Sequence, residues 1–209
     1  MNKNQFLETM NFRHACKVFD DKKKISNEDL DFILEVGKMS PSSFGMEPWK
    51  FLVIQNQDLK ERLRPLCWNQ PQITTCSDLI VVLAKIEDLK PYSEYVKYMF
   101  SRRNLPNEYY EMYLEKYASH LENTMKNNEN ILAWSAKQCY IAIGNMMTGA
   151  ASIGIDSCPI EGFELENIEE VLNIDTAKYR LCVIVPFGYR INEQPSKFRL
   201  EIEDVVSYL

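Results

Sequence analysis

Residues 134–163 read WSAKQCYIAIGNMMTGAASIGIDSCPIEGF, and this stretch decides the fold because a long apolar segment runs directly into a tight turn. From Ile131 to Ile153 apolar residues fall on nearly every side of a helical wheel, which predicts a buried central helix. Gly154 supplies its C-terminal stop. The pattern is interrupted only by Ser135, Lys137, Gln138, Asn145, Thr148 and Ser152.

A membrane span is the competing interpretation of this segment, because about 20 apolar residues are enough to cross a bilayer. Lys137, Gln138 and Asn145 lie well inside the segment, where each would need a special partner in lipid. The chain has no second hydrophobic segment that could accompany it. We therefore expect a soluble protein whose central helix packs closely through small residues, in a core or at a subunit interface.

The overall composition excludes several classes of protein. The chain has 209 residues, which favours one domain over residues 1–209. With 24 Lys and Arg against 30 Asp and Glu, the net charge of −6 argues against nucleic acid or an anionic membrane as a partner. The six cysteines are scattered singly, which predicts no metal site. Since the N-terminus lacks a signal-like apolar run, we expect free thiols and a cytoplasmic protein.

Helices outnumber strands along the chain, so we expect an α+β fold with one small central sheet. The predicted strands are residues 50–55, 79–84 and 181–187, and Pro186 should place the last one at an edge or end it. The predicted helices are residues 4–12, 27–39, 58–66, 131–153 and 165–172. Residues 88–130 form a Tyr-rich excursion of two helices, either a surface pair or an aromatic lid over a pocket. Residues 195–209 form a C-terminal extension that ends in an amphipathic stretch.

Two local features indicate a possible ligand site. Arg13 and Lys17 lie four residues apart and form a basic spot in an acidic protein, which suits either a bound phosphate or ordinary surface charge. The segment 40–45 is dense in turn residues, and its serines are either an ordinary loop or ligands. The chain has only two histidines, so there are few candidate bases for Ser-His or Cys-His nucleophilic catalysis.

Four separated segments together resemble the FMN-dependent, oxygen-insensitive nitroreductases. The strongest match lies in residues 134–163, where A-K-Q-x-Y, G-N, G-x-D and P-I-E-G-F follow the family pattern. The other matches are Arg13-His14 with Lys17, Ser40-Pro41-Ser42-Ser43 with Pro48-Trp49, and Lys197 with Arg199. Cys16 and Cys158 further resemble the nitroimidazole-activating subgroup of epsilonproteobacteria.

The resemblance implies a nitroreductase-like fold, with a small central mixed sheet covered by helices. It also implies a homodimer in which the long central helix lies at the interface and the C-terminal tail wraps the partner. Two FMN sites would lie between the subunits. No metal and no indispensable catalytic side chain are expected, because the chemistry belongs to the flavin.

The resemblance assigns distinct roles to the cofactor-binding positions. Arg13, Lys197 and Arg199 correspond to residues that hold the FMN phosphate, a dianion that needs cations. Lys17 and Asn69 correspond to contacts with the pyrimidine edge of the ring, and Lys17 should raise the flavin potential. The Glu161 N–H should point at flavin N5. The full set of positions is Arg13, His14, Ala15, Lys17, Ser42, Ser43, Asn69, Gln72, Pro159, Ile160, Glu161, Gly162, Lys197 and Arg199, with Ser42 and Ser43 reaching FMN from the other subunit.

Three positions depart from the family pattern. Ala15 stands where many members have a serine, so one hydrogen bond to FMN is lost. Gln72 stands where a second lysine commonly faces the pyrimidine edge, which predicts a flavin that is harder to reduce. Glu47 replaces the usual glutamine and adds a negative charge. Cys158 is either a redox-active thiol or, more in keeping with its residue type, a buried small hydrophobe.

The expected function is electron transfer from NADPH or NADH to FMN and then, two electrons at a time, to nitro compounds or quinones. One alternative is another flavin enzyme of the same superfamily, such as a reductive dehalogenase or a biosynthetic dehydrogenase. A second alternative is an FMN-binding redox sensor, which would stop after one reduction.

Overall fold

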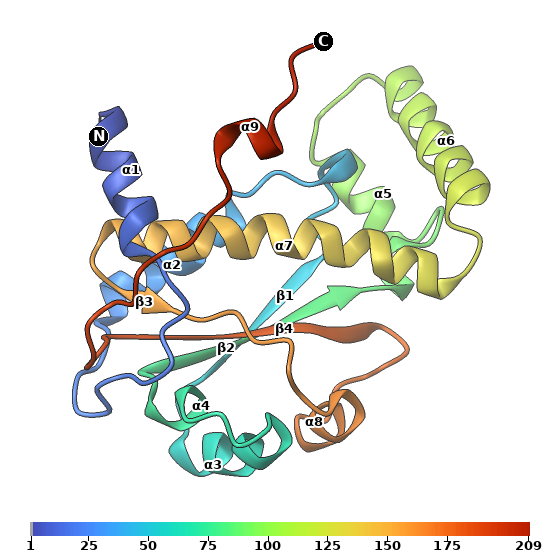
Figure 1. Ribbon diagram of the computed structural model, residues 1–209. Coiled ribbons are helices and arrows are strands. Elements are labelled where there is room, and N and C mark those ends of the chain that lie inside the picture. The colour runs from blue at the N-terminus through green and yellow to red at the C-terminus, as the bar shows by residue number, and fades with distance from the viewer. Residues whose placement is uncertain (1) are drawn as a thin grey trace.

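The computed structural model describes residues 2–209 and confirms the α+β class. A sheet of strand order β1-β2-β4-β3 has helices on both faces (Figure 1). Its strands are β1 (Trp49–Ile54), β2 (Asp78–Lys85), β3 (Asp156–Ser157) and β4 (Tyr179–Gly188). The helices are α1 (Lys3–Phe12), α2 (Asn27–Lys38), α3 (Gln57–Leu66), α4 (Gln72–Thr75), α5 (Glu94–Ser101), α6 (Asn107–Thr124), α7 (Asn128–Ser152), α8 (Leu165–Val171) and α9 (Ile202–Val205), with 3-10 turns η1 (Ser43–Gly45) and η2 (Glu87–Leu89).

The sheet is antiparallel, whereas the family resemblance implied a mixed one. β1 pairs with β2, β2 with β4, and β3 with β4, each in antiparallel register. The parallel component found within residues 2–209 is an isolated bridge between Ala15 and Ser157. This bridge joins the segment after α1 to the short strand β3, which sequence patterns missed because two residues are too few to show a period.

Pro186 lies inside β4, and the prediction that it would mark an edge or an end was wrong. β4 is a central strand, Pro186 pairs with Leu79 of β2, and the strand continues to Gly188. The Pro186 carbonyl accepts a hydrogen bond from the Cys158 N–H at 3.2 Å, on the side away from β2. An N–H at residue 186 would point to that same side, just past the end of β3. Because proline lacks only this N–H, it removes no hydrogen bond between β4 and β2.

Helix α7 confirms the predicted central helix and crosses one face of the sheet (Figure 1). It begins where the Asn127 side chain accepts a hydrogen bond from the Asn130 N–H at 2.9 Å. It ends before Gly154, which adopts a φ of +78° that glycine reaches without strain. Tyr140 and Ile141 remain exposed on it. No helix within residues 2–209 is long and apolar enough to cross a membrane.

Three apolar clusters surround the sheet. The first lies between one sheet face and helices α2 and α7, and it includes Ile33, Val82 and Met146. The second lies on the opposite face, under α3, α4 and α8, and includes Leu63 and Ile168. The third belongs to the excursion, where η2, α5, α6 and the start of α7 enclose their own core. The two-helix excursion is therefore a packed unit rather than a loose pair of surface helices.

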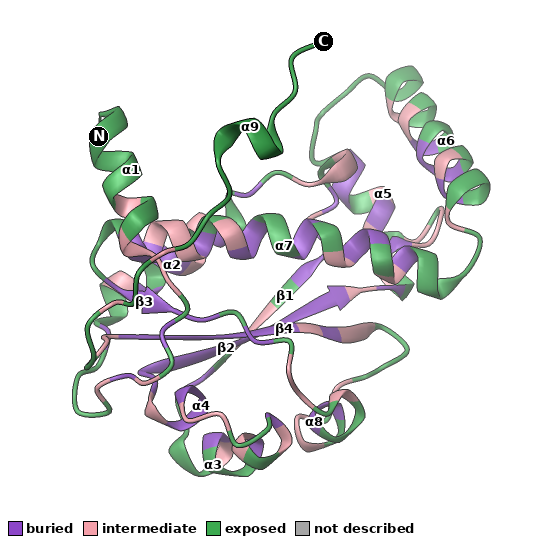
Figure 2. Cartoon of the chain, in the orientation of Figure 1, coloured by how far each residue is buried: buried purple, intermediate pink, exposed green. Residues whose placement is uncertain are grey.

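Both ends of the chain are exposed (Figure 2). Helix α1 buries no residue, although Phe6, Leu7 and Met10 are large and apolar. The final stretch holds only the four-residue helix α9, which is shorter than the amphipathic segment that the sequence predicted. A helix of four residues makes only about one turn, which is too short to form an apolar face.

Candidate cofactor site

The segment after α1 brings several predicted site residues to one edge of the sheet. Arg13 caps α1 in extended geometry, and the chain then runs beside β3. The Cys16 N–H donates to the Ser157 carbonyl at 3.1 Å, and Phe19 forms a bridge with Arg190 after β4. This pairing places residues 13–17 next to Ser157 and Cys158, directly before the segment 159–162, although about 140 residues separate the two in the chain.

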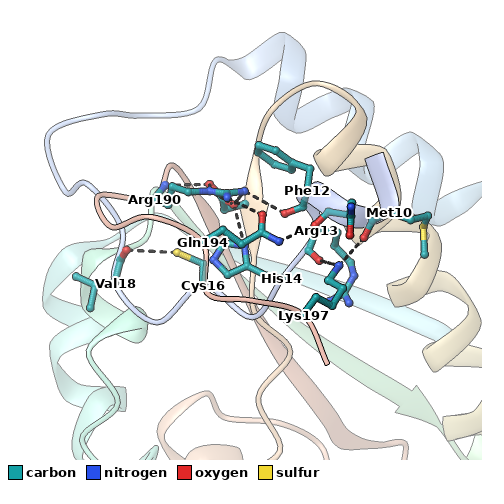
Figure 3. A network of polar contacts seen from close by, with 11 residues as sticks. Met10, Phe12, Arg13, His14, Cys16, Val18, Arg190, Gln194 and Lys197 are labelled. Carbon is teal, nitrogen blue, oxygen red and sulfur yellow. Dashed lines mark hydrogen bonds and ion pairs between the residues drawn. The ribbon is translucent and has the colours of Figure 1, made fainter. Parts of the chain in front are cut away.

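Arg13 and Lys197 lie together where the C-terminal tail crosses the end of α1 (Figure 3). The Lys197 Nζ donates to the carbonyls of Met10 and Arg13, each at 2.6 Å. Burial, followed by the charges of Arg13 and Arg199, lowers the pKa of Lys197 below its ordinary value. Like charges are therefore close together at this point, and an anion would relieve their repulsion.

The donor set fits a phosphate. None of the ion pairs found within residues 2–209 involves Arg13, Lys17, Lys197 or Arg199. In a chain of net charge −6, cations that the protein's own carboxylates leave unpaired are available to an outside anion.

A buried ion-pair network lies beside these cations, and its central residue, Arg190, was not predicted from the sequence (Figure 3). Asp156, which is 3% exposed, accepts from the Arg190 backbone N–H at 2.9 Å and from its Nε at 2.8 Å. The Arg190 guanidinium also donates to the Phe12 carbonyl at 3.1 Å and to Gln194 at 2.9 Å. The network thus ties α1, β3 and the tail together.

His14 completes the network without a hydrogen bond on its Nδ1. That atom lies 3.5 Å from Asp156 Oδ1, is buried, and has no hydrogen-bond partner within residues 2–209. Burial, followed by the Arg190 charge, lowers the pKa of His14 below 6.5, and the Asp156 charge opposes this only in part. At neutral pH the ring is therefore uncharged.

Lys17 and Gln72 converge on one sulfur atom. The Lys17 Nζ lies 3.6 Å from Cys158 Sγ, and the Gln72 Nε2 lies 3.9 Å from the same atom. Gln72 also donates to Gln70 at 2.9 Å, and Gln70 donates to the Gly162 carbonyl at 2.9 Å. Lys17 and Gln72, which the resemblance places at the pyrimidine edge, are thus linked through Cys158.

Cys158 is a buried thiol rather than an accessible one. It is 0% exposed, and burial raises the pKa of its thiol despite the opposing effect of Lys17. A thiol that is protonated and shielded from solvent reacts slowly. This geometry favours the role of a small buried group over that of a redox sensor.

The segment 159–162 presents its backbone to the same edge. Ile160 exchanges both backbone hydrogen bonds with Ile184 of β4, at 2.8 and 3.1 Å. Because N–H groups alternate in direction along an extended chain, the Glu161 N–H points away from the sheet. The Glu161 carboxylate accepts a hydrogen bond from the Tyr140 hydroxyl of α7, a contact that sequence reasoning missed.

Trp68 is a second residue that sequence reasoning missed. Its indole lies against Gly162, where an added Cβ would come within 2.6 Å of the ring. Trp68 and Asn69 both have positive φ, 53° and 55°, so the chain turns sharply directly after α3. Trp68 is 69% exposed, which leaves a large apolar ring at the mouth of the candidate site.

Ser42 and Ser43 lie apart from the other predicted site residues in this chain. They occupy the loop from α2 to β1, where the Ser43 N–H donates to Gln138 at 2.9 Å and Ser42 Oγ accepts from the Glu47 N–H at 2.9 Å. None of the hydrogen bonds found for them within residues 2–209 reaches the segment 13–17. Their role at the flavin of another subunit stays a prediction.

Comparisons with known proteins agree with this arrangement. The sequence profile described as "Nitroreductase family" matches residues 10–189. A Bacillus subtilis (strain 168) protein that carries the name of an NAD(P)H nitroreductase, YfkO, is 42% identical over 217 residues, which is 99% of this chain and 98% of that protein. A nitroreductase from Exiguobacterium sibiricum 255-15, solved in complex with FMN, has 25% identity and a TM-score of 0.85, with 98% of this chain and 97% of that chain covered. The fold of Bacillus subtilis ydfN matches with a TM-score of 0.88 over both full chains at 22% identity.

Proposed function

Because the chain belongs to the nitroreductase family, we propose that it is an FMN-dependent oxidoreductase that transfers electrons from NADPH or NADH to nitro compounds or quinones. The observation that carries the proposal is the cluster of Arg13, Lys197 and Arg199, none of which takes part in an ion pair found within residues 2–209. Bound FMN would supply the ring that accepts a hydride and passes on two electrons. The work of the protein is then to bind, orient and tune this ring.

The phosphate end of the site is built from residues far apart in the sequence. Arg13, Lys197 and Arg199 would bind the phosphate dianion through charge-assisted hydrogen bonds. Lys197 donates to the Arg13 carbonyl, so the tail lies at the site. His14 and Ala15 provide the backbone between the phosphate end and the ring end. The methyl group of Ala15 offers no hydroxyl there.

At the ring end, Lys17 and Asn69 would contact the pyrimidine edge, with Gln72 beside them. A lysine at this edge stabilises the reduced anionic ring and raises its potential, whereas the neutral Gln72 adds no charge. The Glu161 N–H would donate to N5, and the backbone of residues 159–162 would line the ring. Support comes from the direction of this N–H, which the Ile160–Ile184 pairing fixes.

The functional unit in this proposal is a homodimer. A groove of about 730 Å³ between α1, α2 and α7 is lined by Phe6, Met10, Met39 and Met147 among others, and its apolar side chains favour burial by a second copy. The tail exposes Phe198, which suits a segment that wraps a partner. Ser42 and Ser43 of one subunit would then reach the flavin of the other.

The nitroimidazole-activating subgroup and the cytoplasm are the finer parts of the proposal. Cys16 and Cys158 lie in the same apolar cluster, which supports their appearance as a pair. Nitroimidazoles are therefore included among the proposed acceptors. All six cysteines are free thiols, which suits a reducing compartment.

An absorption spectrum of the purified protein with FMN, recorded without oxygen before and after excess NADPH, tests the function. We expect a bound-flavin spectrum that bleaches and then recovers when a nitroimidazole is added. Repeated cycles under excess NADPH would separate an enzyme from a sensor, which stops after one reduction. A protein that binds no flavin, or a flavin that neither NADPH nor NADH reduces, would contradict the proposal.

A further inference from the structure

The loop that carries Ser42 and Ser43 has a strained backbone. Phe44 and Glu47 have φ values of 55° and 45°, and Gly45 between them has 64°. Glycine adopts this left-handed region freely, but a residue with a side chain does so only at a cost in free energy. Two such residues within four positions therefore need contacts from elsewhere in the fold to hold them.

Helix α5 and the residues just after it supply those contacts. Arg103 donates a hydrogen bond to the Phe44 carbonyl, and Arg102 lies 3.2 Å from the Glu47 carboxylate. The Tyr95 hydroxyl lies 2.8 Å from the Met46 carbonyl and 3.1 Å from the Glu47 carbonyl, so its proton is shared between the two. Figure 1 shows the short turn η1 beside this end of the excursion.

The excursion also holds the loop through its apolar core. The Phe44 ring meets Tyr117 edge-on, with 5.3 Å between centroids, and lies 5.5 Å from the His120 ring. Met46 is fully buried in the core formed by α5, α6 and the start of α7. The loop is thus packed as part of the excursion and does not sit on it as a separate flap.

The same loop is connected to the two serines by short hydrogen bonds. The Glu47 N–H donates to Ser42 Oγ and the Gly45 N–H donates to the Ser42 carbonyl, each at 2.9 Å. The Met46 N–H donates to the Ser43 carbonyl at 3.2 Å. A change in the backbone at residues 44–47 therefore changes the positions of both serines directly.

We propose that Arg103 and Tyr95 are positioning residues, which hold the strained loop so that Ser42 and Ser43 are preorganised for the flavin. This inference rests on the proposed function, because it takes these serines to be flavin contacts. Preorganisation improves binding by removing the ordering that the ligand would otherwise impose. The excursion is then part of the cofactor site, in addition to any role it has as a cover over the acceptor.

The test uses Arg103→Ala and Tyr95→Phe in the full-length protein, with amide hydrogen exchange of residues 43–47 and the Kd for FMN as readouts. We expect faster loop exchange without FMN and a Kd raised about fivefold in each variant, the size expected from one lost hydrogen bond. Arg103→Lys, which keeps one donor, should recover part of both effects. The matched controls are Lys97→Ala, whose ammonium pairs with Glu94 on the same helix, and Tyr109→Phe, whose side chain is exposed on α6.

The possible results distinguish the positioning role of Arg103 and Tyr95 from the proposed function. Loop exchange that stays at the wild-type rate in both variants would overturn the holding role of α5. Faster exchange with an unchanged Kd for FMN would overturn the link from the loop to the flavin. Failure of the wild-type protein to bind FMN would instead refute the proposed function, while the exchange data would still report on the loop. Tyr95→Phe loses a single oxygen atom and keeps its ring packing, so it remains informative if Arg103→Ala is poorly folded.

Discussion

Replacing Asp156 by Asn should destabilise this protein far more than the loss of an ordinary surface ion pair. The Asp156 side chain is 2% exposed and lies 2.5 Å from an Arg190 Nη2. The substitution keeps the shape of the side chain but removes its charge, and it sets amide hydrogens against the arginine donors. Arg190 is then left without a counter-ion in a mostly buried position, because its side chain is only 20% exposed.

The magnitude follows from this burial. Removing one partner of a buried ion pair costs about 3–5 kcal/mol, since the remaining charge stays desolvated. Partial access of water to Arg190 places the expected loss near the lower end, about 3 kcal/mol in the free energy of unfolding. For a chain of this length that corresponds to a fall in Tm of about 6–12 °C.

Urea unfolding of the FMN-free protein, followed by circular dichroism, measures this loss. Protein concentration must be held fixed, because association of subunits stabilises the folded state by mass action. The matched control is Glu35→Gln, which removes the partner of Lys38 in a pair whose side chains are 54% and 68% exposed. Its expected cost is below about 0.5 kcal/mol. A loss of less than 1 kcal/mol for Asp156→Asn, or two equal losses, would refute the reasoning from burial.

Three further predictions concern titration, thiols and the flavin. Burial lowers the pKa of His14 below 6.5 in the folded protein, so on acidification the unfolded chain takes up a proton at a higher pH than the folded protein does. The stability that the uncharged His14 contributes is therefore complete above pH 6.5 and is lost as the pH falls through the folded pKa. His14→Gln should therefore flatten the decline in the free energy of unfolding between pH 7 and 5, and parallel curves for the two proteins would exclude this. Iodoacetamide should alkylate Cys182 first, because this thiol is partly exposed and a hydrogen bond with Cys139 lowers its pKa. Burial raises the pKa of Cys16 to about 11 and that of Cys67 to about 12, so these thiols should react more slowly. Peptide mass spectrometry after a short exposure to iodoacetamide decides the order. Gln72→Lys should raise the flavin midpoint by about 30 mV, equivalent to about 1.4 kcal/mol for two electrons, and a potentiometric titration that finds no rise would contradict the role given to charge at this position.

Local sequence patterns predicted most elements, since their signals lie within a few residues. The apolar run from Ile131 to Ile153 predicted α7, which spans Asn128–Ser152. The helix predicted over residues 27–39 matches α2, whose start is capped by the Ser26 side chain, which accepts from the Asp29 N–H at 3.0 Å. Helix caps and apolar periods are short-range properties, so a sequence alone can reveal them.

Motif spacing also predicted which segments contribute to the candidate site, but not how these segments meet. Lys197 and Arg13 were both predicted to bind phosphate, and the fold brings them into contact across 184 residues. What the sequence could not reveal is that Lys197 is held there by backbone carbonyls, or that Cys158 joins Lys17 to Gln72. Contacts of this kind depend on which segments the sheet places side by side.

The sequence by itself determined the α+β class, the central helix and the family, because each depends on residue type and local spacing. Only the tertiary structure decided that Pro186 could lie inside a central strand, since that depends on where β3 ends beside it. It also decided that Asp156 faces Arg190 and that Phe44 is held by Arg103. These pairings join residues distant in the chain, and their free energy depends on burial, which exists only once the chain has folded.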